Sequence, residues 1–210
     1  MPTFDSHIMK NPEIFRENRL PAHSDHLYIS GDKKSCRYSL NGMWKFSYSA
    51  NIEMAVKGFE QLSYDCSGWN DIPVPAHIQM EGYDRPVYVN VQYPWDGREE
   101  VEPGRIPERF NPTASYVKMF SLPKQMRGQE VFISFQGVES GFALWLNGQY
   151  VGYSEDSFTP AEFAITPYLR EGENKLAVQV YKWIKAFRTA EACSRYAYQT
   201  FHNSLEVIGK

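Results

Sequence analysis

Short stretches of alternating hydrophobic and polar residues recur along most of the chain. Residues 43–48 alternate aromatic with polar side chains, and residues 131–135 place valine, isoleucine and phenylalanine on one face. A period of two is typical of half-buried strands. Four more strands are predicted at residues 71–75, 86–94, 116–120 and 176–183. The two prolines in the first of these do not suit the middle of a sheet.

The clearest local signal is a hairpin. Two β-prone runs, residues 142–146 and 149–153, are joined by Asn147 and Gly148. An Asn-Gly pair between such runs favours a type I′ turn, because both turn positions need a positive φ. Strands at this spacing, with Gly and Pro in the turns and no long helices between them, indicate an all-β fold, an antiparallel β-sandwich or jelly roll.

Three segments before the last strand follow a different pattern. Residues 1–35 are expected to form an extended N-terminal arm, since its prolines oppose helix formation. Residues 50–59 predict a short helix that ends near Gly58. Residues 95–112 form a long charged loop, and loops of this length are uncommon unless they serve a site or an interface.

The end of the chain is the second place where a helix is conceivable. Residues 184–203 contain neither Gly nor Pro, but the apolar stripe of the corresponding helix ends after two turns. An isolated helix of this length is marginal in water. We therefore expect a loosely docked helix or a disordered tail. Removal of residues 185–210 would then change the free energy of unfolding by no more than about 1 kcal/mol.

Composition narrows the classes of function. The 210 residues include 42% hydrophobic side chains, enough for a packed core, and the formal net charge of −3 argues against a nucleic-acid binder. The longest apolar runs are too short to span a bilayer, and the N-terminus lacks the pattern of a secretory signal. Three widely spaced cysteines suggest reduced thiols in a cytoplasmic protein. The aromatic content of 15% fits strands, and also surfaces that stack on sugars.

No motif selects a catalytic or metal site. A glycosidase needs two facing carboxyl groups, but none of the acidic candidates has a context that singles it out. Glu155 and Asp156 follow the hairpin, where turn hydrogen bonding is favoured over a cation site. His23 and His26 are a weak metal signal. The candidate carboxyl groups are Asp84, Asp96, Glu139, Glu155, Asp156 and Glu162.

Several segments taken together resemble the N-terminal domain of bacterial β-galactosidases of glycoside hydrolase family 2. The pattern that begins Ile72-Pro73-Val74-Pro75 and continues to Gly82-Tyr83-Asp84 is one of them. Another is Pro86-Val87-Tyr88-Val89-Asn90-Val91-Gln92-Tyr93-Pro94. The remaining matches are residues 11–23, 40–46 and 137–154. Their common order along the chain makes the resemblance specific.

The resemblance implies a galactose-binding-like jelly roll that binds β-galactosides such as lactose. It assigns substrate binding to Asn90, whose amide would hydrogen-bond galactose hydroxyls, and to Val91, which would line the same pocket. It places both catalytic glutamates of the retaining enzyme in a later barrel, so this chain alone is expected to be inactive. Intact family enzymes use magnesium and a monovalent cation. We expect no cofactor in this chain, because the residues that bind them are largely missing.

The sequence departs from the family after Trp183. The family continues with an acidic segment that supplies a galactose-binding aspartate, whereas this chain reads Ile184-Lys185-Ala186-Phe187. A shifted reading frame or a truncated gene would produce such a change. The predicted organisation is thus an arm (1–35), a sugar-binding jelly roll (36–183) and an atypical tail (184–210). A stand-alone carbohydrate-binding module remains an alternative, as does an interaction domain whose arm docks on other subunits or domains.

Overall fold

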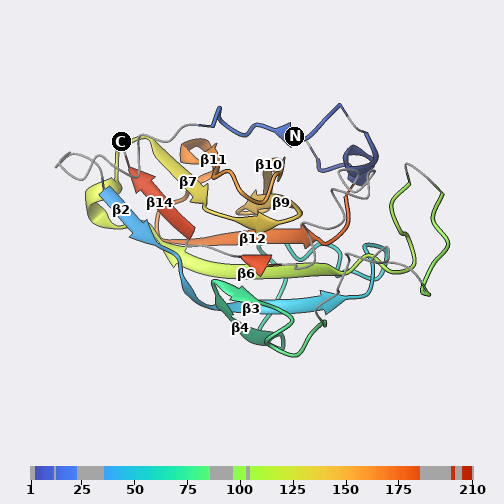
Figure 1. Cartoon of the computed structure of the whole chain (residues 1–210). Coiled ribbons are helices and arrows are strands. Elements are labelled where there is room, and N and C mark those ends of the chain that lie inside the picture. The colour runs from blue at the N-terminus through green and yellow to red at the C-terminus, as the bar shows by residue number, and fades with distance from the viewer. Residues whose placement is uncertain are drawn as a thin grey trace.

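The computed structural model describes residues 3–11, 13–22, 36–85, 97–102, 105–184, 200–201 and 205–209. Its strands pair antiparallel and form one large sheet and two smaller ones (Figure 1). The seven-stranded sheet has the order β1 (Arg16–Glu17), β10 (Gln149–Glu155), β9 (Gly141–Leu146), β12 (Glu173–Tyr181), β6 (Thr113–Ser121), β3 (Gly42–Ser49) and β4 (Asn70–Val74).

The second sheet packs over one face of the first. It has the order β11 (Ala161–Ala164), β7 (Val131–Phe135), β14 (Leu205–Gly209) and β2 (Cys36–Ser39). A third, small sheet has the order β5 (Ala76–His77), β13 (Thr200–Phe201) and β8 (Val138–Glu139). Helical structure in the described ranges is limited to the one-turn 3-10 helices η1 (Ser6–Lys10), η3 (Lys124–Met126) and η4 (Thr166–Tyr168). The predicted all-β sandwich is confirmed.

The hydrophobic pattern places the core as predicted. The central strand β12 directs Leu176 and Val178 into the layer between the seven-stranded and the four-stranded sheet, where they meet Ile133 and Phe135 of β7. Its alternate residues, such as Ala177 and Tyr181, face the outer side of the large sheet. Both faces of β12 are therefore buried, which explains the mostly apolar run of residues 176–181 in its second half.

The predicted turn and strand positions agree with the structure. Asn147 and Gly148 have φ values of 54° and 81°, as a type I′ turn requires, and they join β9 to β10. The strand β4 contains Pro73 and lies at an edge of the seven-stranded sheet. An edge strand tolerates a proline, because the N–H group that proline lacks is not needed for pairing on the open side. The expected strand at residues 86–94 lies outside the described residues.

The expected helix at residues 50–59 is wrong. The segment folds as successive turns, with the side chain of Asn51 accepting from the backbone N–H of Met54 at 2.9 Å. Gly58 takes a φ of 73°, which turns the chain so that Phe59 enters the aromatic cluster on the outer face of the sheet. Tertiary packing of this one ring therefore outweighs the helix propensity of the preceding residues.

The N-terminal arm is not simply extended. Where it is described, it forms η1 and β1, and β1 pairs with β10 of its own domain. The Phe4 ring lies 5.8 Å from the ring centroids of Trp145, Tyr150 and Tyr153, and 5.9 Å from that of Tyr181. This part of the arm therefore packs against the sheet of its own domain.

The expectation of a helical or disordered tail is wrong for the tail residues that the structure describes. Residues 205–209 form β14, which lies between β7 and β2 (Figure 1). Val207 and Ile208 are buried, with exposed fractions of 0% and 2%. Two consecutive β-branched residues suit a strand that is covered on both faces. Residues 185–199 lie outside the described part.

We predict that the domain loses stability above pH 10. Burial, reinforced by the nearby charge of Asp84, raises the pKa of Tyr48 to about 12. The unfolded phenol ionises near pH 10, so the stabilisation present below that pH is lost as the pH rises towards about 12. Urea unfolding between pH 9 and about pH 12 measures this loss, and Tyr48→Phe should reduce it. Normal ionisation of Tyr48 near pH 10 in the folded protein would contradict the prediction.

Candidate functional site

The residues assigned to sugar binding by resemblance, Asn90 and Val91, lie outside the described residues, as does Asp96. The chain on either side of them is described. Asp84 lies shortly before this segment and Arg98 shortly after it. We therefore describe the candidate site by the residues that contact Asp84 on one side of this segment and residues 98–99 on the other.

An ion pair between Asp84 and Lys182 fixes the first flank. The Lys182 ammonium donates a hydrogen bond to the Asp84 carboxylate, and the two side chains are only 1% and 5% exposed. Burial lowers the pKa of Lys182, and the Asp84 charge opposes that shift. The positive charge of Arg98 also lowers the Lys182 pKa, whereas the negative charge of Glu139 raises it.

The backbone around Lys182 is held by reciprocal hydrogen bonds. The Asn111 side chain donates to the Trp183 carbonyl and accepts from the Trp183 N–H, both at 2.9 Å. The Ser140 hydroxyl donates to the Lys182 carbonyl at 3.0 Å. The Lys182 ammonium lies 5.1 Å from the centroid of the Trp183 ring. Together these contacts fix the position of the ammonium that binds Asp84.

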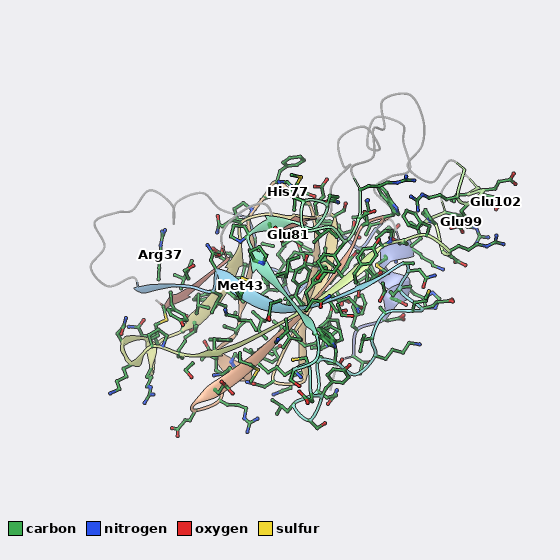
Figure 2. All side chains as sticks on the ribbon, turned by 90° about the horizontal axis from the view of Figure 1, so that it is seen from below. Arg37, Met43, His77, Glu81, Glu99 and Glu102 are labelled. Atoms are coloured by element: carbon green, nitrogen blue, oxygen red, sulfur yellow. The ribbon has the colours of Figure 1, made fainter. Side chains whose placement is uncertain are left out.

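Glu99 organises the second flank. Its carboxylate accepts hydrogen bonds from the backbone N–H groups of Glu108, Arg109 and Phe110, at 3.0, 2.8 and 3.2 Å. The guanidinium of Arg98 lies 3.7 Å from the centroid of the Phe110 ring. Figure 2 shows Glu99 and Glu102 at one end of the molecule, well separated from His77 and Glu81. The long charged loop thus has internal order where it is described.

The remaining carboxyl candidates do not form a glycosidase pair. Asp84 and Glu139 both raise the Lys182 pKa, and both side chains are buried, whereas a glycosidase pair must face a sugar. Asp156 accepts from the N–H groups of Phe158 and Thr159, which confirms the turn interpretation. Glu155 accepts from the Tyr153 hydroxyl at 2.7 Å, and Glu162 is buried in β11.

Among the residues that the structure describes, no three or more His, Cys, Asp or Glu side chains are grouped so that they could hold a metal ion. His23, His26 and His202 lie outside the described ranges. No helix in the described residues is both long and apolar enough to cross a membrane.

The comparisons with known proteins agree with the fold and with the order of the motifs. The family model described as "Glycosyl hydrolases family 2, sugar binding domain" matches residues 37–206. The chain belongs to this family. The match continues past Trp183, where the sequence departs from the expected pattern, and ends within β14.

Relatives of this family 2 domain are β-galactosidases. A β-galactosidase of Halalkalibacterium halodurans is 55% identical over 83% of this chain and 18% of its own length. A β-galactosidase large subunit of Lactobacillus helveticus is 38% identical over 96% of this chain and 35% of its own length. The chain matches the N-terminal sugar-binding domain of these enzymes and spans less than half of their length.

Solved structures of family 2 enzymes share its fold. A β-glucuronidase from glycoside hydrolase family 2 superposes with a TM-score of 0.62 at 22% identity, over 84% of this chain and 18% of that one. A β-glucuronidase from Ruminococcus gnavus gives a TM-score of 0.61 at 17% identity, over 88% and 30%. At these identities the likeness supports the fold alone.

Proposed function

We propose that this family 2 domain binds terminal β-D-galactosides, such as lactose, as the sugar-binding part of a β-galactosidase. The observation that carries the proposal is the match of residues 37–206 to the family 2 sugar-binding domain, together with 55% identity to a β-galactosidase. We assign the galactose contacts to Asn90 and Val91, because their segment carries the motif that resembles the family's sugar-binding motif. The names of the relatives support galactose as the sugar.

The proposal assigns binding but no hydrolysis to this chain. Asp84 and Glu139, the two described carboxyl groups whose charges act on Lys182, are both buried. Hydrolysis by the retaining mechanism requires two opposed carboxyl groups about 5 Å apart across the bond that is cleaved. We propose that a longer β-galactosidase supplies them from a further domain.

A stand-alone carbohydrate-binding module is the second candidate. The packed core and the docked arm favour it, because the described residues bury their apolar side chains against one another. The two candidates differ in affinity. A half-site that lacks its catalytic domain leaves few contacts for the sugar, whereas a self-sufficient module reaches micromolar dissociation constants.

Calorimetric titration with methyl β-D-galactopyranoside tests the proposal. We expect a millimolar dissociation constant, which corresponds to about 4 kcal/mol of binding free energy. Asn90→Ala should weaken binding about tenfold, because it removes an amide that both donates and accepts. The exposed Asn70 at the edge of the sheet provides a matched control, since Asn70→Ala changes an asparagine away from Lys182. Unchanged binding by Asn90→Ala would overturn the assignment.

A further inference from the structure

A cavity lies on the outer face of the seven-stranded sheet, apart from the residues around Lys182. Its volume is about 360 Å³, and it is bounded by the N-terminal arm, by the turns of residues 52–61 and by the β9–β10 hairpin. It shares no residue with the cluster of Asp84, Lys182 and Asn111. The volume is within the usual range of small-molecule sites in proteins, which begins at about 300 Å³.

One wall of this cavity is aromatic. Phe4 and Phe59 each contact the Trp145 ring edge to face, with ring centroids 5.8 Å apart. Tyr150 continues the wall, and its hydroxyl is held by the Glu17 carboxylate at 2.7 Å. Phe59, Tyr150 and Trp145 are at most 9% exposed, so the half-buried Phe4 ring offers the most apolar surface for the C–H face of a pyranose ring.

The rest of the lining carries polar side chains of both charges. Lys57 and Glu60 contribute one positive and one negative group, and Gln61 and Gln179 contribute two amides. Glu60 accepts a hydrogen bond from the Gln61 amide at 3.0 Å. Gln179 uses one amide N–H on Ser115 and its carbonyl on Tyr181, which leaves a second N–H as a donor. Balanced charge and several amide groups suit a neutral polyhydroxyl ligand better than a phosphate or a carboxylate.

A lysine of the large sheet fixes the polar side of the cavity. Lys175, a buried residue of β12, donates hydrogen bonds to the backbone carbonyls of Gln61 at 2.6 Å and of Tyr64 at 3.0 Å. Burial lowers the pKa of this lysine. Its ammonium fixes the chain that carries Glu60 and Gln61, so little conformational freedom remains to be lost when a ligand binds.

We infer that this cavity is a second carbohydrate site, which takes one neutral pyranose ring between the aromatic wall and the Glu60–Gln61 pair. It does not depend on the proposed role of Asn90, because none of its residues belongs to that segment. A domain with both sites could hold two sugar units of a longer saccharide, or two separate molecules.

NMR titration of the whole chain with galactose tests this inference. We expect the Trp145 indole and Gln61 side-chain resonances to shift with a millimolar dissociation constant. Gln61→Ala should weaken galactose binding, followed by the Trp145 shift, about fivefold, because one hydrogen bond to the sugar is lost. The fold should stay intact, because Gln61 is exposed. Gln125→Ala, an exposed glutamine in η3, is the control and should bind as the unmodified chain does.

The Asn90→Ala variant separates the two sites. It should leave the shifts of Trp145 and Gln61 unchanged even where calorimetry shows weaker binding overall. Shifts confined to residues near Lys182 would overturn the second site and support the proposed function. Shifts confined to the residues that line the cavity would support the second site and overturn the proposed role of Asn90. Resonances of Trp145 and Gln61 that stay unmoved up to about 100 mM galactose would also overturn the second site.

Discussion

Deletion of residues 205–210 is expected to destabilise the domain by about 4 kcal/mol and to expose two sheet edges. The strand β14 lies between β7 and β2, and its Val207 and Ile208 are almost fully buried. Complete burial of one such side chain contributes about 1.5–3 kcal/mol, so the two account for most of the loss. The freed edges of β7 and β2 would also promote aggregation.

Urea unfolding and light scattering measure both consequences of this deletion. Removal of Lys210 alone is the control and should have little effect, because that residue lies beyond β14. A single substitution, Val207→Asp, should reproduce most of the loss of stability by placing a charge in the layer between the sheets. If the six-residue deletion costs less than about 1 kcal/mol, β14 is not an integral strand of the domain.

Replacement of Asp84 by Asn is expected to cost about 3 kcal/mol of folding free energy. The Lys182 ammonium is 1% exposed and loses the carboxylate that compensates its burial. Removal of one partner from a buried ion pair typically costs about 3–5 kcal/mol, because an unpaired charge remains in the interior. The nearby charge of Glu139 places this site at the lower end of that range.

A double variant distinguishes the unpaired charge from lost packing. Asp84→Asn combined with Lys182→Met removes both charges at similar volume and should recover most of the stability that Asp84→Asn loses. Urea unfolding of the two single variants and the double variant gives the coupling free energy. Additive losses would show that Asp84 and Lys182 do not act as a pair. Lys45→Met, which breaks the exposed pair with Asp71, is the control and should cost well under about 1 kcal/mol.

Local pattern was sufficient to predict the strands that carry their own signals. The β9–β10 hairpin follows from Asn147 and Gly148, whose positive φ values the turn requires. The edge position of β4 follows from its prolines. In both cases the physical cause lies within a few residues, so a single sequence contains it.

Elements stabilised by distant contacts could not be predicted in this way. The arm is ordered by Phe4, whose ring partners are more than 100 residues away. The strand β14 is too short to show a period, and it depends on β7 and β2 for every ladder hydrogen bond. The expected helix at residues 50–59 is wrong for the same reason. Phe59 packs against residues that are distant in the sequence, so residues 50–59 alone do not indicate this contact.

The site was predictable only in part. Asp84 was among the carboxyl candidates, but its partner Lys182 was not identified, because the two lie 98 positions apart. Asn111 and Glu99 were missed likewise, since their hydrogen bonds go to the backbone and leave no motif. A charged residue directly after the apolar end of β12, and next to Trp183, was the one signal that could have pointed to Lys182.

The most direct test of the proposed function is the location at which a galactoside binds. Backbone amide shifts of isotope-labelled chain should be recorded during titration with methyl β-D-galactopyranoside. We expect shifts at Asn90 and Val91, and at the flanking residues Asp84, Arg98 and Lys182. In Asn90→Ala the shifts of the flanking residues should require about tenfold more ligand. Binding that leaves these amides unmoved would contradict the assignment of the galactose site to this part of the domain.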